Sequence, residues 1–220
     1  MDTNATLPTL AETAVARLRE QIVSGEIPGG ARLAEAAVAQ GLGVSRVPVR
    51  EALVRLERDG FVEFSPTGRA RVKELSPGDF EELFTLRLAL EPLAAKLAAP
   101  VLRADQGGLK RNVEKTRRAG SVREVTCLDL EFHELILVAA GNTRLLSLWR
   151  SLRGELELWL GLLHRQHQTR TRETREETVQ AHLEILEGFA KESPAVCERI
   201  LRRHILGWRD WLPTFEEVGA

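Results

Sequence analysis

The sequence contains only two cysteines, Cys127 and Cys197, and they form no CxxC pair. Because two isolated cysteines provide no disulfide framework, we expect them to be buried thiols in a reducing cytoplasm. The first ten residues have neither a basic segment nor a long apolar run, so no secretory signal peptide is predicted. No stretch approaches the ~18 uninterrupted apolar residues that a membrane span requires. The composition therefore predicts a cytoplasmic protein that does not contact the membrane.

An excess of charge of one sign is also missing, since the formal net charge is −1. Residues 1–76 contain ten Lys and Arg against ten Asp and Glu. This balance argues against nonspecific binding of nucleic acid over the whole surface, so any DNA contact must come from the placement of a few cations. Hydrophobic residues make up 43% of the chain, which is enough to build a core and argues against disorder.

The sequence changes character near residues 73–77, and neither half contains a repeat or a low-complexity tract. Before this point, short periodic segments predict three helices and a hairpin, over 14–24, 33–40, 45–59, and 61–64 with 70–73. After it, helical periods predict six helices, over 76–99, 105–119, 121–140, 142–168, 174–191 and 193–211. The expected N-caps in this half include Ser76, Ser121, Asn142 and Thr174. We expect a mainly α protein, with an N-terminal winged helix-turn-helix domain over 8–75 and an antiparallel six-helix bundle over 77–212.

The third expected helix carries the residues that point to DNA. Ser45 is a suitable N-cap that also suits a phosphate, and Arg46 and Arg50 are four residues apart, so they project from one face. Such a helix N-terminus can enter the major groove, where arginine bonds guanine in bidentate fashion. Arg69 and Arg71 alternate along the second strand of the hairpin, which places two cations on the wing. The alternative is a small domain with solvated arginines, and the helix-turn-helix with its wing favours DNA binding.

The N-terminal half closely resembles the GntR superfamily of bacterial regulators, over residues 8–75 and through the stretches 25–33, 42–53, 56–57 and 60–62. The resemblance implies that Arg46 and Arg50 contact the operator and that the wing glycine, Gly68, enters the minor groove. One departure is Ala36, where some relatives have a base-contacting arginine in the second helix. The operator preference of those relatives is therefore not expected to apply here.

Three of the five histidines and one aspartate are expected inside the C-terminal bundle. Asp129 and His133 are four residues apart on an apolar helix face, and His182 and His204 lie on apolar faces of two adjacent helices. A carboxylate and imidazoles inside a helical core need partners, and together they suit a divalent transition ion with open coordination positions. Each histidine alone is more often an ordinary core or surface residue. The other two are expected on the surface: His164 and His167.

Residues 77–212 resemble the FadR-type C-terminal ligand-binding domain of these regulators, called FCD, in the short six-helix form of the VanR-like subgroup. The matching residues are Arg87 with Leu90-Glu91, Asp129 with Phe132-His133, the stretch 139–142, His182 and Arg203-His204. The resemblance implies a divalent metal held at the positions of Asp129, His133, His182 and His204. Zinc is the expected ion, and nickel and manganese are also allowed by nitrogen-rich ligation. Such domains bind small carboxylates at the metal with the help of an arginine, which implies Arg87 as the effector-binding residue.

These observations predict a transcription regulator rather than an enzyme. We expect a homodimer on double-stranded operator DNA, because one recognition helix contacts only a few base pairs, with control by a small carboxylate effector. One alternative is a metal-dependent hydrolase, in which the same aspartate and histidines activate water. No general base is apparent beside those ligands, and the N-terminal half would have no role. A binding module without a DNA role would leave the shared face of Arg46 and Arg50 unexplained.

Overall fold

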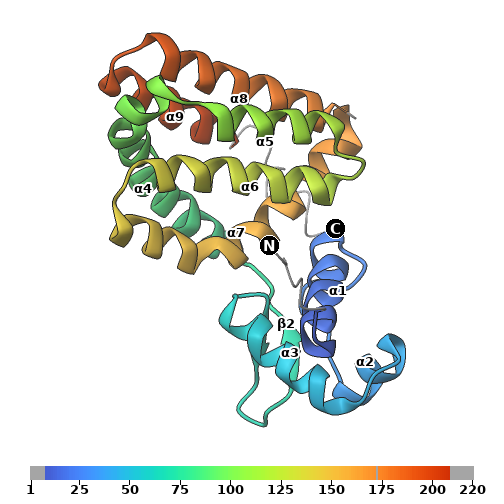
Figure 1. The fold of residues 1–220 in the computed structure, drawn as a ribbon. Helices are drawn as coiled ribbons and strands as arrows, with labels where there is room; N and C mark the ends of the chain where they lie inside the picture. The colour runs from blue at the N-terminus through green and yellow to red at the C-terminus, as the bar shows by residue number, and fades with distance from the viewer. Residues whose placement is uncertain (1–7, 172, 209–220) are drawn as a thin grey trace, which may run out of the picture. The chain divides into compact units, whose positions relative to one another are not determined.

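The computed structural model describes residues 8–171 and 173–208, and the chain forms two compact units, 1–74 and 75–220 (Figure 1). Residues 8–74 of the first unit contain three helices and two strands: α1 (Leu10–Ser24), α2 (Glu35–Leu42), α3 (Arg46–Arg58), β1 (Val62–Phe64) and β2 (Ala70–Val72). The described part of the second unit contains six helices: α4 (Pro77–Ala104), α5 (Gly107–Arg118), α6 (Val122–Ala139), α7 (Thr143–Thr171), α8 (Thr174–Lys191) and α9 (Pro194–Gly207). The predicted fold class, a winged helix-turn-helix followed by a helical bundle, is confirmed.

Helices α1 and α3 pack against each other at the centre of the first unit. The most deeply buried side chains here are at most 1% exposed, and they include Leu18, Val49, Leu53 and Leu56. Helix α1 begins earlier than predicted because Thr9 and Glu12 form a reciprocal capping box. The Glu12 N–H donates to Oγ1 of Thr9 (3.1 Å), and the Thr9 N–H donates to the Glu12 carboxylate (2.8 Å).

The wing of the first unit is a small sheet in which β2 is the central segment. Strands β1 and β2 are antiparallel and pair Glu63 with Arg71, while Arg32 bridges Arg71 from the other side. The N–H of Leu33 bonds to the carbonyl of Ala70 (2.9 Å). Leu33 is therefore part of the wing rather than the start of a helix, and α2 begins two residues later than predicted.

The second unit buries a continuous apolar core between its helices. Helix α4 packs along α9, and α5 packs against both α6 and α8, which run beside it in Figure 1. The largest side chains that are fully enclosed there include Phe84, Phe132, Trp149 and Phe189. Helix α4 continues past its predicted end, through Pro100 to Ala104, because its packing against the core outweighs the missing N–H of the proline.

The ends of the last helices differ from the prediction in detail. Helix α7 continues to Thr171 instead of ending near residue 168. The N-cap of α8 is Glu173, so the prediction that Thr174 caps this helix is wrong. Thr174 is instead the first helical residue, where its side chain is buried in the bundle. The predicted end of the last helix, Trp211, lies outside the described residues.

Two serines that precede a proline allow a test of helix capping in the bundle. Ser76→Ala is expected to lower the free energy of unfolding by about 1 kcal/mol, because Oγ of Ser76 accepts a hydrogen bond from the N–H of Asp79. Ser193→Ala is the matched control and should have less effect, since the Ser193 side chain makes no capping bond. Urea unfolding followed by tryptophan fluorescence reports on the bundle, because every tryptophan lies after residue 148. Equal losses in both variants would contradict the capping explanation.

Candidate functional site

The N-terminus of α3 presents three of the predicted DNA-binding residues to solvent. Ser45, Arg46 and Arg50 are exposed, while Val49 and Leu53 on the other face of α3 are fully buried against the core. Ser45 occupies the N-cap position with an extended backbone, but its side chain makes no capping bond. Its hydroxyl and the first N–H groups of α3 therefore form a suitable phosphate site.

Arg50 is held in place by a carboxylate of the neighbouring helix α2. Its Nε donates to Oε1 of Glu35 (2.8 Å), and its Nη2 donates to Oε2 (2.9 Å). The Arg50 side chain is nevertheless 69% exposed. This bidentate contact fixes the orientation of the guanidinium on the outer surface of the helix-turn-helix, which reduces the entropy lost when the side chain binds a partner.

The three predicted wing residues lie at different places in the hairpin. Gly68 lies in the turn with φ of +72°, a conformation that favours glycine. Arg69 lies between this turn and β2, so the prediction that it belongs to the second strand is wrong. Arg71 is in β2 and pairs with Glu63 directly opposite. Arg69 is exposed and forms no ion pair with the described residues, which makes it the freer cation of the two.

The second unit brings together the four predicted metal ligands. Asp129 and His133 come from successive turns of α6, His182 from α8 and His204 from α9. One ligand atom of each lies within 4.8 Å of the others. Nε2 of His133 is 3.2 Å from Nε2 of His204, and Nε2 of His182 is 3.1 Å from Oδ1 of Asp129. The ring of Phe132 stacks on His182 with centroids 3.8 Å apart and holds it in place.

Two members of this cluster lack most of the partners that buried polar groups normally have. Asp129 and His182 are fully buried, and apart from the 3.1 Å contact between them neither side chain has a hydrogen-bonding contact with the described residues. Such orphaned groups carry a large desolvation cost. A cation among the four residues would remove that cost, and three nitrogens with one carboxylate are a donor set that zinc and related ions accept.

The protonation states of the cluster also suit a metal. Burial lowers the pKa of His182 and of His204 below the ordinary histidine value, so both imidazoles stay neutral at neutral pH. Burial alone would raise the pKa of Asp129, but contact with His182 and the nearby His133 outweigh it and hold that pKa low. Neutral imidazoles and an ionised carboxylate are the forms that coordinate a cation.

A second carboxylate, Glu91 of α4, contacts the cluster through His133. Its Oε2 lies 2.7 Å from Nδ1 of His133, which favours a proton on Nδ1 and leaves Nε2 unprotonated toward the cluster. Arg87 donates to both oxygens of Glu91, at 2.7 and 3.2 Å, and Nε1 of Trp149 donates to Oε1 at 2.8 Å. Glu91 was not predicted as a site residue, although its spacing of four residues from Arg87 places both on the inward face of α4.

Arg87, the predicted effector-binding residue, is fully buried, and two of its three guanidinium nitrogens, Nε and Nη2, donate to Glu91. Its guanidinium carbon also lies 4.9 Å from the centre of the Trp208 ring. Nη1 alone has no hydrogen-bond partner among the described residues. Arg87 therefore offers a ligand one remaining nitrogen rather than a free charged fork.

The prediction that His164 and His167 lie on the surface is wrong. Their side chains are 0% and 6% exposed, because the apolar period of α7 continues through Leu160 and Leu163 into these two residues. Nδ1 of His164 lies 2.8 Å from the hydroxyl of Thr126, and Nδ1 of His167 lies 2.9 Å from that of Thr174. Burial lowers the pKa of His164 to about 4. Neither histidine belongs to the group of four ligand atoms.

Two known protein families match the chain. The sequence profile of the bacterial regulatory proteins of the gntR family matches residues 10–72, and that of the FCD domain matches residues 82–207, which is more than half of the chain. The chain belongs to the GntR family. It is a transcriptional regulator whose second unit is an FCD domain, as the two resemblances implied.

Individual relatives of this GntR regulator agree with that assignment. A probable D-xylose utilization operon transcriptional repressor of Paenarthrobacter nicotinovorans is 27% identical over 213 residues, which are 93% of this chain and 92% of the relative. The gluconate operon transcriptional repressor of Bacillus subtilis is 29% identical over 147 residues, which are 65% of this chain and 60% of that repressor. The crystal structure of a putative transcriptional regulator GntR from Rhodococcus sp. RHA1 has a TM-score of 0.73 at 21% identity, covering 93% of this chain and 98% of its own, and it shows the shared fold.

None of the described helices of this GntR regulator combines the length and the apolar composition of a membrane-spanning segment.

The role of Glu91 in this GntR regulator can be tested by metal affinity. Glu91→Gln is expected to weaken the binding of a divalent ion by about 10- to 100-fold, because a neutral carboxamide holds the Nδ1 proton of His133 less strongly. Glu134→Gln is the control, since Glu134 pairs with Arg150 and Arg153 rather than with a ligand. Competition with a chelating dye measures the affinity, and circular dichroism establishes that both variants fold. A folded Glu91→Gln protein with unchanged affinity would contradict this role.

Proposed function

We propose that this regulator binds operator DNA as a homodimer through α3 and the wing, and releases the DNA when a small carboxylate binds beside a divalent metal. The observation that carries the metal part is the convergence of Asp129, His133, His182 and His204, in which the fully buried pair Asp129 and His182 has no hydrogen-bonding contact with the described residues beyond the 3.1 Å contact between them. Zinc fits this donor set best, and nickel and manganese are compatible with it. The bound ion would supply a positive charge at the centre of the bundle. The protein would act in the cytoplasm, where operator DNA is found.

The charges around the cluster favour an anionic effector. Imidazoles coordinate a cation in their neutral form, so the single charge of Asp129 leaves a divalent ion with a net positive charge, while Glu91 pairs with Arg87. An anion entering this buried region gains charge-assisted hydrogen bonds and strong attraction at low dielectric. Nη1 of Arg87 is a buried donor that such an anion can use. One relative is named for a gluconate operon, and gluconate is a carboxylate.

An apolar stripe on α4 supports the proposed dimer. Leu86, Leu93 and Leu97 are each 42% exposed and Val101 is 55% exposed, and their spacing of seven, four and four residues keeps them on one helix face. Exposed leucines in such a row are unfavourable in water, so a second copy of α4 is the occupant that we assign to this stripe. Two copies also supply the two recognition helices that a palindromic operator requires.

Helix α4 offers a route from the effector to the DNA. It begins at Pro77, only five residues after the end of β2, and it carries Arg87 and Glu91 on its inward face and the leucine stripe on its outer face. A ligand changes DNA affinity only if it binds one conformation of the protein better than the other. A small displacement of α4 would change the spacing of the two recognition helices, which the pitch of the duplex fixes.

A regulatory function agrees with the sequence and structure better than a metal-dependent hydrolase activity does. The relatives named above are transcriptional regulators, and the first unit belongs to a family of DNA-binding domains. Glu91 is the carboxylate next to the cluster, but its oxygens already accept hydrogen bonds from Arg87 and Trp149. It is therefore poorly placed to act as a general base.

Operator release by carboxylates tests the proposed sensing function. Metal-loaded protein on operator DNA is titrated with small carboxylic acids and with their methyl esters, which have a similar shape but no charge. At least one acid is expected to release the DNA while its ester does not. His182→Ala should lose most of the metal and the response, and His167→Asn, which alters a buried histidine outside the cluster, should keep both. A neutral or cationic effector, or an unaltered response in His182→Ala, would contradict the proposal.

Arg50→Ala is expected to weaken specific operator binding by about 1–3 kcal/mol if the guanidinium bonds a guanine. Arg58→Ala is the control, because Arg58 is also exposed but lies at the other end of α3. Fluorescence anisotropy with operator and with scrambled DNA measures the two affinities. Similar losses in both variants, or a loss that is equal on scrambled DNA, would argue against a base-specific role for Arg50.

The proposed dimer interface is the leucine stripe of α4. Leu93→Glu places a charge in the middle of the stripe and is expected to convert the dimer to a monomer, because an unpaired charge is costly in an apolar interface. Leu206→Glu changes a leucine of similar exposure on α9 and should leave the dimer intact. Sedimentation velocity at micromolar concentration distinguishes one chain from two. A Leu93→Glu protein that remains a dimer would refute the assigned interface.

A further inference from the structure

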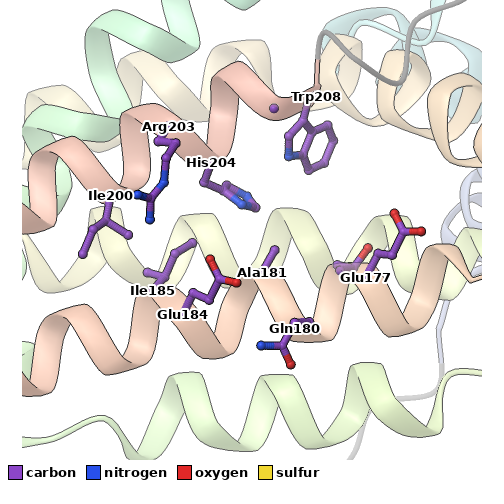
Figure 2. Close-up of a pocket in the computed structure, with 11 residues that line it drawn as sticks. Glu177, Gln180, Ala181, Glu184, Ile185, Ile200, Arg203, His204 and Trp208 are labelled. Atoms are coloured by element: carbon purple, nitrogen blue, oxygen red, sulfur yellow. The ribbon is translucent and has the colours of Figure 1, made fainter.

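The four residues of the metal cluster differ in their exposure to solvent. Asp129, His133 and His182 are fully buried, whereas His204 is partly exposed. His204 lines a cavity of about 360 Å³ between α8 and α9. Figure 2 shows the rings of His204 and Trp208 entering this space from α9, with Ala181 of α8 across from them. We call this cavity the α8–α9 groove.

We propose that the α8–α9 groove is the route by which a divalent ion reaches the cluster, with Ala181 keeping the route open and Glu184 attracting the cation. The proposal rests on the metal centre described under the proposed function. The burial of three ligands and the partial exposure of the fourth carry the argument. An ion from solvent meets His204 first, and Nε2 of His204 is 3.2 Å from Nε2 of His133.

The small side chain of Ala181 preserves the width of the groove. Ala181 lies one residue before the ligand His182 and lines the groove opposite the α9 residues. A bulky side chain at this position would fill space directly in front of His204. Leu183, two residues after Ala181, lies on another side of α8 and lines the cavity between α5 and α8. The same helix thus offers a position inside the route and a matched position outside it.

The charged residues of the groove provide a second and independent way to test the proposed route. Glu184 and Arg203 both line the groove and are exposed, and neither forms an ion pair with the described residues. The third charged residue, Glu177, has Oε2 3.1 Å from Nε2 of His167. Charges at the mouth of a cleft change the local concentration of an approaching ion. Glu184 should therefore speed the arrival of a cation, and Arg203 should slow it.

The experiment measures metal loading of the full-length apo-protein by stopped flow, with Zn²⁺ as the probe and tryptophan fluorescence as the signal. Trp208 is a suitable reporter because its ring centroid is 5.8 Å from that of His204. Ala181→Phe is expected to slow both loading and chelator-driven release by about tenfold or more, since a filled groove must open before an ion passes. The equilibrium affinity should stay within about threefold, because a barrier acts equally on both directions. Leu183→Phe should load like the wild type.

The charge variants keep the proposal falsifiable even if Ala181→Phe does not fold. Glu184→Gln should load about two- to tenfold more slowly and Arg203→Gln should load faster, with both differences shrinking at high salt. Glu187→Gln is the control, because Glu187 pairs with Lys191 and lines the other cavity. Loading rates that are unchanged in Ala181→Phe and Glu184→Gln, or equally changed in Leu183→Phe and Glu187→Gln, would overturn the route. Wild-type protein that binds no ion would overturn the metal centre itself, and the route with it.

Discussion

The second unit depends on how it accommodates the buried carboxylates of Glu91 and Asp129. Glu91 is surrounded by donors, since Arg87 and Trp149 both bond to it. Asp129 has only a 3.1 Å contact with Nε2 of His182, and no arginine or tryptophan among the described residues donates to it. An uncompensated charge in a helical core costs several kcal/mol, so it is retained only where something outside the chain's own donors balances it. This contrast between two carboxylates in one core is the physical basis for assigning a cation to Asp129.

Helix α4 carries the features that the proposed regulation needs to combine. Its inward face holds the Arg87–Glu91 pair behind His133, its outer face holds the leucine stripe, and its N-terminus follows the wing within a few residues. The Arg87–Glu91 pair is fully buried, and breaking it would leave an unpaired charge in the core. A ligand that engages Arg87 must therefore displace or share this pair, which links ligand binding to the position of α4.

Most of the fold could be predicted from the sequence because its signals are local. Helical periods, Gly and Pro positions and the capping residues identified each helix and the hairpin, and the motif around Arg46 and Arg50 indicated the recognition helix. The errors concern places where tertiary contacts override local preference. Helix α4 passes through Pro100 because its inward face is buried, and Leu33 joins the wing rather than α2. His164 and His167 were wrongly predicted to be exposed because they lie in a stretch rich in Arg and Gln, which is typical of a protein surface.

The sequence by itself determined the two-part organisation and the recognition helix, since these follow from local periods and a contiguous motif. It also indicated the four candidate ligands, through apolar helix faces and the resemblance to FCD domains. Only the tertiary structure decided that Glu91 supports His133, that Glu35 orients Arg50, and that His204 is the ligand nearest to solvent. These relations join residues from different helices. Their distances depend on how the helices pack against one another, and no periodicity within a single segment encodes that packing.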